Sequence, residues 1–76
     1  MRLWISKYAL SDGIMTVDGM EIHDGGKYAS NDKLFVRLGK EAHETLEDAK
    51  DAAEAMRRRR IISLRKQIER LEAMKF

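Results

Sequence analysis

The sequence predicts an α+β fold, in which a small antiparallel β-meander over residues 1–39 precedes one long helix over residues 45–74. Two observations lead to this prediction. All five glycines lie before residue 40, within short turn signals that separate apolar segments. From residue 45 the apolar residues instead recur at the 3.6-residue period of a helix, and the 76-residue chain has no proline to interrupt it. A chain of this length forms a single domain with a small core.

Four turn signals divide the first half of the chain into short strand candidates: SDG at 11–13, DG at 18–19, DGG at 24–26 and SND at 30–32. The strands are expected at residues 3–10, 14–17, 20–23, 27–29 and 34–38. The Asp18-Gly19 pair suits a two-residue type I′ hairpin, in which Val17 would face Met20. In the last strand Phe35 and Arg37 alternate with apolar neighbours, which predicts one buried and one outward face.

The helix has a predicted start and two predicted halves. Thr45 and Asp48 have the spacing of a capping box, which favours a helix start here. Small side chains dominate the apolar stripe over residues 46–56, so this half should pack closely on the sheet. Larger side chains follow at the 3, 4, 3 spacing of a coiled-coil seam: Ile61, Leu64, Ile68 and Leu71. These four residues are candidates for self-association as a homodimer, since an exposed apolar stripe is typical of an interface.

The charge is distributed unevenly along the chain. Residues 1–56 carry 7 basic and 11 acidic side chains, a net charge of −4, whereas residues 57–76 carry 8 and 2, a net charge of +6. An antiparallel dimer would bring the acidic stretch 41–54 of one chain near the basic stretch 57–70 of the other. The chain has no cysteine, no secretion signal and no apolar run of membrane-spanning length, so we expect a cytoplasmic protein.

Four consecutive arginines form the densest charge in the sequence. Consecutive positions point around a helix, so Arg57, Arg58, Arg59 and Arg60 should make a girdle. Glu54 can pair with Arg58 at the i, i+4 spacing. The first interpretation of this segment is a solvated basic turn whose arginines make structural ion pairs. The second is contact with nucleic acid through the girdle, Arg65 and Lys66. The third is a role at a membrane surface.

No catalytic, cofactor or metal site is expected. The two histidines, His23 and His43, have no second ligand at metal-binding spacing, and no serine lies in a nucleophile motif. Each of the three aspartates before a glycine is expected to serve a turn. The aromatic residues Trp4, Tyr8, Tyr28 and Phe35 are more often core residues than binding residues, but those exposed together on the outer sheet face would form a binding patch. The candidates for contact with a partner are Trp4, Tyr8 and Tyr28 together with the basic helix residues.

Three segments resemble short bacterial proteins of prophage type, a group without an established activity: LWISKYALSDGI at 3–14, ETLEDAKDAAEAMR at 44–57 and IISLRKQIERLEAMKF at 61–76. The resemblance implies that the protein is encoded in a mobile element. Small proteins of mobile elements include regulators, nucleic-acid binders and inhibitors of host defence such as anti-CRISPR proteins. It assigns no functional residue.

Two functions therefore remain as expectations. The favoured one is a non-enzymatic accessory protein of a mobile element that binds and occludes a host protein, in the manner of an anti-CRISPR inhibitor. The alternative is a nucleic-acid-binding regulator that uses the basic helix segment 57–66. The favoured function follows from the girdle, whose arginines do not form one basic face, and from the absence of aromatic residues among them to stack on bases.

Overall fold

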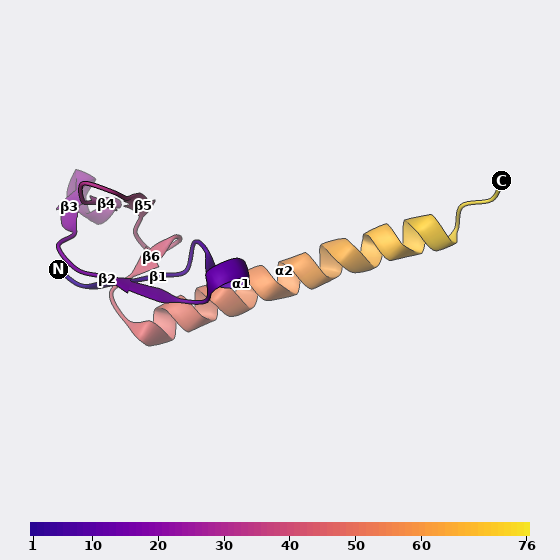
Figure 1. The fold of residues 1–76 in the computed structure, drawn as a ribbon, viewed down its shortest axis with the longest axis horizontal. Helices are drawn as coiled ribbons and strands as arrows, with labels where there is room; N and C mark the ends of the chain where they lie inside the picture. Colours follow the sequence, from indigo (N-terminus) through magenta and orange to yellow (C-terminus); the bar gives the residue numbers. More distant parts are fainter.

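The computed structural model describes residues 1–76 and consists of two small antiparallel sheets followed by one long helix (Figure 1). The first sheet has the strand order β2 (Met15–Val17), β1 (Leu3–Ile5), β6 (Ala42–His43). The second has the order β3 (Glu21–His23), β4 (Tyr28–Ser30), β5 (Phe35–Arg37). The helices are α1 (Ala9–Asp12), the 3-10 helix η1 (Asp24–Gly26) and α2 (Leu46–Glu72). The predicted α+β class is confirmed, with two sheets where one meander was expected.

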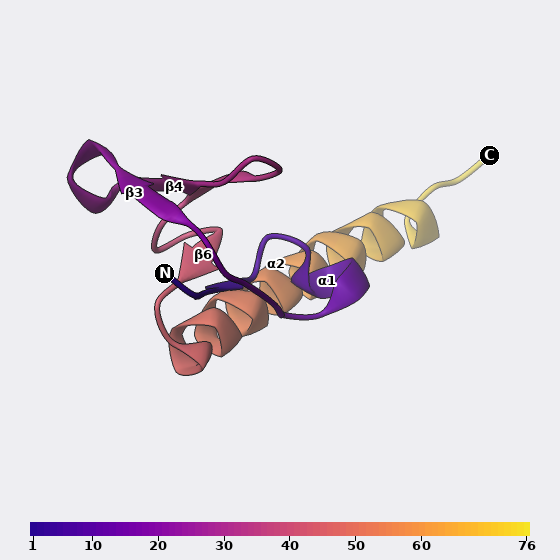
Figure 2. The same cartoon turned by 60° about the vertical axis from the view of Figure 1, so that its left-hand side comes forward.

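The hydrophobic core lies between the two sheets. Leu3, Ile5 and Ala42 from the first sheet meet Ala29 and Val36 from the second, and all five are fully buried. Because side chains alternate along a strand, the neighbours of these residues point to the opposite faces. The first sheet therefore has the second sheet on one side and the first half of α2 on the other, a layering that Figure 2 shows from a second direction.

The predicted Asp18-Gly19 hairpin is wrong. β2 pairs with β1, so Val17 lies opposite Leu3, and β3 pairs instead with β4. The chain crosses from the first sheet to the second at Gly19, which has a positive φ of 74°. Met20 is then 4% exposed and joins the core between the sheets. Burial of this side chain between the sheets outweighs the local turn preference of the Asp-Gly pair.

The first and last segments of the β region also differ from the expectation. The strand predicted over residues 3–10 ends at Ile5, and α1 follows it. Ser6 and Lys7 turn away from the sheet because their N–H groups donate to the Glu41 carbonyl at 3.0 and 3.2 Å. That contact brings Ala42 and His43 beside β1 as a sixth strand, which the turn pattern did not predict.

The alternation predicted for the strand over residues 34–38 is confirmed in β5. Val36 is buried, whereas Phe35 and Arg37 point outward from the second sheet. The 27–29 candidate appears one residue later, as β4, and the 20–23 candidate as β3.

The long helix begins and continues as predicted. Thr45 is its N-cap, and the Thr45 hydroxyl accepts the Asp48 N–H at 3.1 Å, which satisfies one of the free donors at the helix start. The helix runs unbroken to Glu72. Ala49 is buried against the first sheet and Ala53 and Met56 are half-buried, as expected, but Leu46 is 40% exposed. Beyond Met56 the helix leaves the body, which gives a molecule of 55 × 21 × 20 Å.

Candidate functional site

The three aromatic candidates do not share one sheet face. Trp4 lies on β1, half-buried on the face turned toward α2, where it stands opposite Thr16 and His43. Tyr8 lies in the turn before α1, with the Lys7 ammonium 5.7 Å from the centre of its ring. Tyr28 lies on β4 in the second sheet. The structure therefore separates these residues, and only Tyr28 has an aromatic partner.

That partner is Phe35, on the outer face of the second sheet. The two rings stack with centroids 5.2 Å apart and planes inclined by 26°, and Phe35 is 60% exposed. The register of β3, β4 and β5 places four polar side chains on the same face. We call this surface the outer-sheet patch: Glu21, His23, Tyr28, Ser30, Phe35 and Arg37. Sequence alternation indicated that Phe35 points outward, but the diagonal contact with Tyr28 depends on a strand register that the sequence did not specify.

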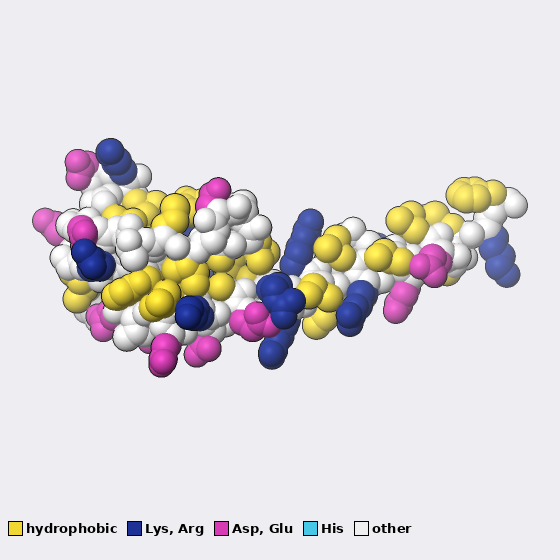
Figure 3. Space-filling view, turned by 60° about the horizontal axis from the view of Figure 1, so that its bottom comes forward, with side chains coloured by type: hydrophobic (Ala, Val, Ile, Leu, Met, Phe, Trp, Pro, Cys, Tyr) yellow, Lys and Arg dark blue, Asp and Glu magenta, His cyan; other side chains and the backbone are white.

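The arginine girdle is partly neutralised. Arg58 lies 3.4 Å from the Glu54 carboxylate, as predicted, and Arg57 makes a second, closer ion pair with the same carboxylate. The hydrogen bond from Arg57 lowers the pKa of Glu54 and raises that of Arg57. The other basic residues of the segment make no ion pair: Arg59, Arg60, Arg65 and Lys66. Figure 3 shows Lys and Arg side chains, in dark blue, gathered where the helix leaves the body.

The apolar residues of the projecting helix are uncovered. We call Ile61, Leu64, Ile68 and Leu71 the distal stripe. Ile61 is half-buried, whereas Leu64, Ile68 and Leu71 are 40%, 53% and 64% exposed. Neither sheet reaches this part of α2, so the condition under which the sequence predicted an interface is met.

A buried Ser6–His43 pair was missed by the sequence reasoning. The Ser6 hydroxyl and His43 Nε2 are 2.8 Å apart, although 37 residues separate them in the chain. Ser6 is fully buried and His43 is 5% exposed, so no substrate can reach this hydroxyl. The pair satisfies two polar groups in the layer between the first sheet and α2, and it is structural. Only a correct prediction of β6 would have revealed it.

The His43 imidazole should make stability depend on pH. Burial lowers the His43 pKa, and the nearby Asp48 carboxylate opposes that shift only in part. The unfolded chain, with a histidine pKa of about 6.5, then binds more protons than the folded one. The free energy of unfolding should therefore be at its maximum above about pH 6.5, and it should decrease as the pH falls through the lower pKa of the folded state.

Denaturant unfolding across this pH range measures the effect. His43→Gln retains an amide that can reach Ser6 but does not titrate, so it should remove part of the slope. His23→Gln is the matched control, because it removes the other imidazole from an exposed surface position. Equal slopes for the wild type and His43→Gln would contradict the assignment.

Two hollows mark the surface, and neither contains a catalytic arrangement. One, of about 340 Å³, lies beside His43, Glu44 and Asp48. The other, of about 460 Å³, runs between α1 and α2. No group of three or more histidine, cysteine or acidic side chains is placed to hold a metal ion.

The chain was also compared with known proteins. No protein-family model, curated protein or solved structure matches it. No helix combines the length and the apolar character that crossing a bilayer requires.

Proposed function

We propose that this is a non-enzymatic binding protein that occludes a surface of another protein through its outer-sheet patch. The observation that supports this most strongly is the stacked Tyr28–Phe35 pair, with Phe35 60% exposed on an open sheet face. Aromatic and arginine side chains contribute most of the binding energy at protein interfaces, and Arg37 lies directly opposite Tyr28. The mobile-element resemblance favours a host protein as the partner, of which a nuclease-type defence complex is one version.

The proposal that the protein is not an enzyme rests on its serine–histidine geometry. The buried Ser6 is inaccessible, as described above. The second pair, His23 Nε2 and Ser30 Oγ at 2.6 Å, is exposed on the outer sheet, but no third side chain orients the imidazole and neither hollow adjoins it. Nucleophilic catalysis requires an oriented base and donors for the oxyanion. A fluorophosphonate probe should leave Ser30 unlabelled.

Site-specific photo-crosslinking tests the proposed surface. A photoreactive phenylalanine analogue at position 35 should form a covalent adduct with one host protein in bacterial cells. The same analogue at Thr16, which is exposed on the first sheet, is the control and should form none. Mass spectrometry of the adducts identifies the partner. Equal adduct patterns from both positions, or adducts with nucleic acid alone, would contradict the proposal.

Nucleic-acid binding is the second candidate, because four cations of segment 57–66 have no acidic partner in the folded chain. If phosphates are the ligand, duplex binding should appear at low salt and fall steeply as salt rises. Arg59→Ala with Arg60→Ala should then weaken binding more than Arg57→Ala, since Glu54 already holds Arg57. Negligible binding at physiological salt favours the protein partner.

A further inference from the structure

The side of α2 that carries the distal stripe continues along the helix into the body of the molecule. Counting back from Leu71 in steps of three and four residues passes through Leu64 and Arg57 and reaches Ala53 and Lys50. Arg57, Ala53 and Lys50 line the groove of about 460 Å³ between α1 and α2, together with Ala9 and Leu10. The apolar stripe and the groove therefore lie along one continuous side of the helix.

We infer that a second copy of this chain packs antiparallel along that side and places its distal end in the α1–α2 groove. An antiparallel pair centred near residue 66 sets Ile61 against the partner's Leu71 and Leu64 against the partner's Ile68. By symmetry this makes four apolar layers, and each large side chain of the distal stripe meets another. The distal stripe of a second copy therefore matches this stripe in the spacing and in the size of its side chains.

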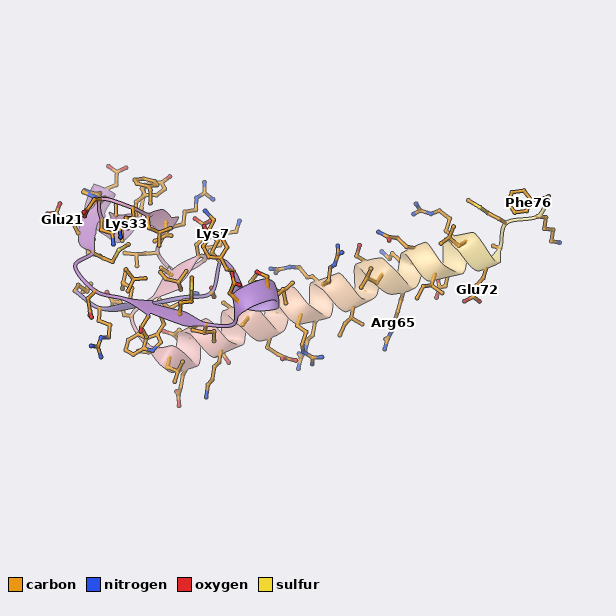
Figure 4. The ribbon with its side chains drawn as sticks, viewed as in Figure 1. Lys7, Glu21, Lys33, Arg65, Glu72 and Phe76 are labelled. Atoms are coloured by element: carbon orange, nitrogen blue, oxygen red, sulfur yellow. The ribbon has the colours of Figure 1, made fainter.

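The flanking charges favour the antiparallel direction. In this register Arg58 lies beside the partner's Glu72, and the symmetry creates the pair twice. Figure 4 shows Arg65 and Glu72 extending from the same side of α2, which is the flank of the stripe. The distal residues 67–76, which face each net −4 body, carry two basic and two acidic side chains, so they bring no excess of negative charge to it. A parallel pair would set the two acidic bodies side by side and match the arginine girdles with each other.

The same register fills the groove. Residue 76 of the partner lies opposite residue 56, so the partner's Phe76 reaches the apolar walls formed by Ala9, Leu10 and Ala53. These walls are open to contact, since Leu10 is 52% exposed, and Phe76 is completely exposed beyond the end of α2 (Figure 4). The groove thus receives the one large aromatic residue of the distal segment.

Distances between spin labels in the full chain test the arrangement. The protein has no cysteine, so Ala55→Cys and Lys66→Cys each give a single labelling site, and both side chains are exposed and point away from the stripe. At about 1.5 Å per residue the two Ala55 labels should be separated by about 33 Å along the helix axis. The two Lys66 labels should have almost no axial separation. A parallel pair would give the same short distance at both positions and would overturn the inference.

Light scattering coupled to size exclusion measures the association itself. A mass of twice 8.8 kDa at high micromolar concentration is expected. Added salt should strengthen the dimer, because two net +6 segments lie against each other, with Arg65 facing its own copy at the symmetry axis, and salt screens this repulsion. Leu64→Glu should yield monomer, whereas Ile62→Glu, on the opposite side of the helix, should not. Leu10→Lys should weaken the dimer at least severalfold. A wild-type mass of 8.8 kDa would overturn the dimer, and an unchanged affinity for Leu10→Lys would overturn the role of the groove.

Discussion

Ile5→Ala is expected to remove most of the stability of the protein. Ile5 is fully buried, and it joins the two sheets in a core of only six buried residues. Removing three carbons from such a site costs about 2–5 kcal/mol. A 76-residue domain has a total stability of only about 4–11 kcal/mol, so the loss is a large share of the whole.

Thermal unfolding followed by circular dichroism measures this effect. The midpoint should fall by more than about 10 °C, because 1 kcal/mol shifts it by about 4–8 °C in a domain of this size. Ile62→Ala is the matched control, since Ile62 is 53% exposed, and its midpoint should change little. A similar small change for both variants would show that the core does not lie between the sheets.

Tyr28→Ser combined with Phe35→Ser is expected to have the largest effect on binding. The two rings support each other in a stack, so removing both eliminates the aromatic part of the outer-sheet patch. Interface residues of this kind contribute about 2–4 kcal/mol, which corresponds to a loss of about 30- to 1000-fold in affinity. Phe35 makes little contact with the core, so the double variant should still fold.

Calorimetry with the purified partner measures that loss. Tyr8→Ser is the matched control, because Tyr8 is a tyrosine that is 37% exposed and lies in the turn before α1, away from the second sheet. Its affinity should stay within about threefold of the wild type. Equal losses for Tyr8→Ser and the double variant would point to an interface centred elsewhere.

The helix could be predicted from the sequence because its signals are local. The Thr45 cap, the 3.6-residue period and the absence of proline and glycine after Gly39 act within a few residues of each other. Exposure of the distal stripe followed from length, since a helix of about 40 Å is longer than strands of three residues.

The sheets could be predicted only in part, because strand pairing is not local. Asp18-Gly19 fits a hairpin by its composition, yet β2 pairs with β1 and β3 with β4, so the chain crosses between the sheets after this pair. β6 has two residues and no pattern of its own, and it exists because the Glu41 carbonyl accepts two N–H groups from the turn after β1. The Tyr28–Phe35 stack and the Ser6–His43 pair both depend on these pairings, so the sequence did not reveal them.

Two separate surfaces follow from this architecture. The outer-sheet patch lies at one end of the elongated molecule and the distal stripe at the other, with the arginine girdle between them (Figures 1 and 3). A dimer formed through the helices would leave both outer-sheet patches uncovered. The protein could then bind two copies of a partner, which raises the effective affinity for a target that is itself multimeric.

Hydrogen exchange of the full chain tests the central proposal most directly, when it is measured with and without the partner protein that photo-crosslinking identifies. If the outer-sheet patch is the binding surface, the partner should slow exchange in β4 and β5, and the amides of residues 57–66 should exchange at unchanged rates. Slower exchange confined to residues 57–66, with β4 and β5 unaffected, would contradict the proposal and assign binding to the basic helix.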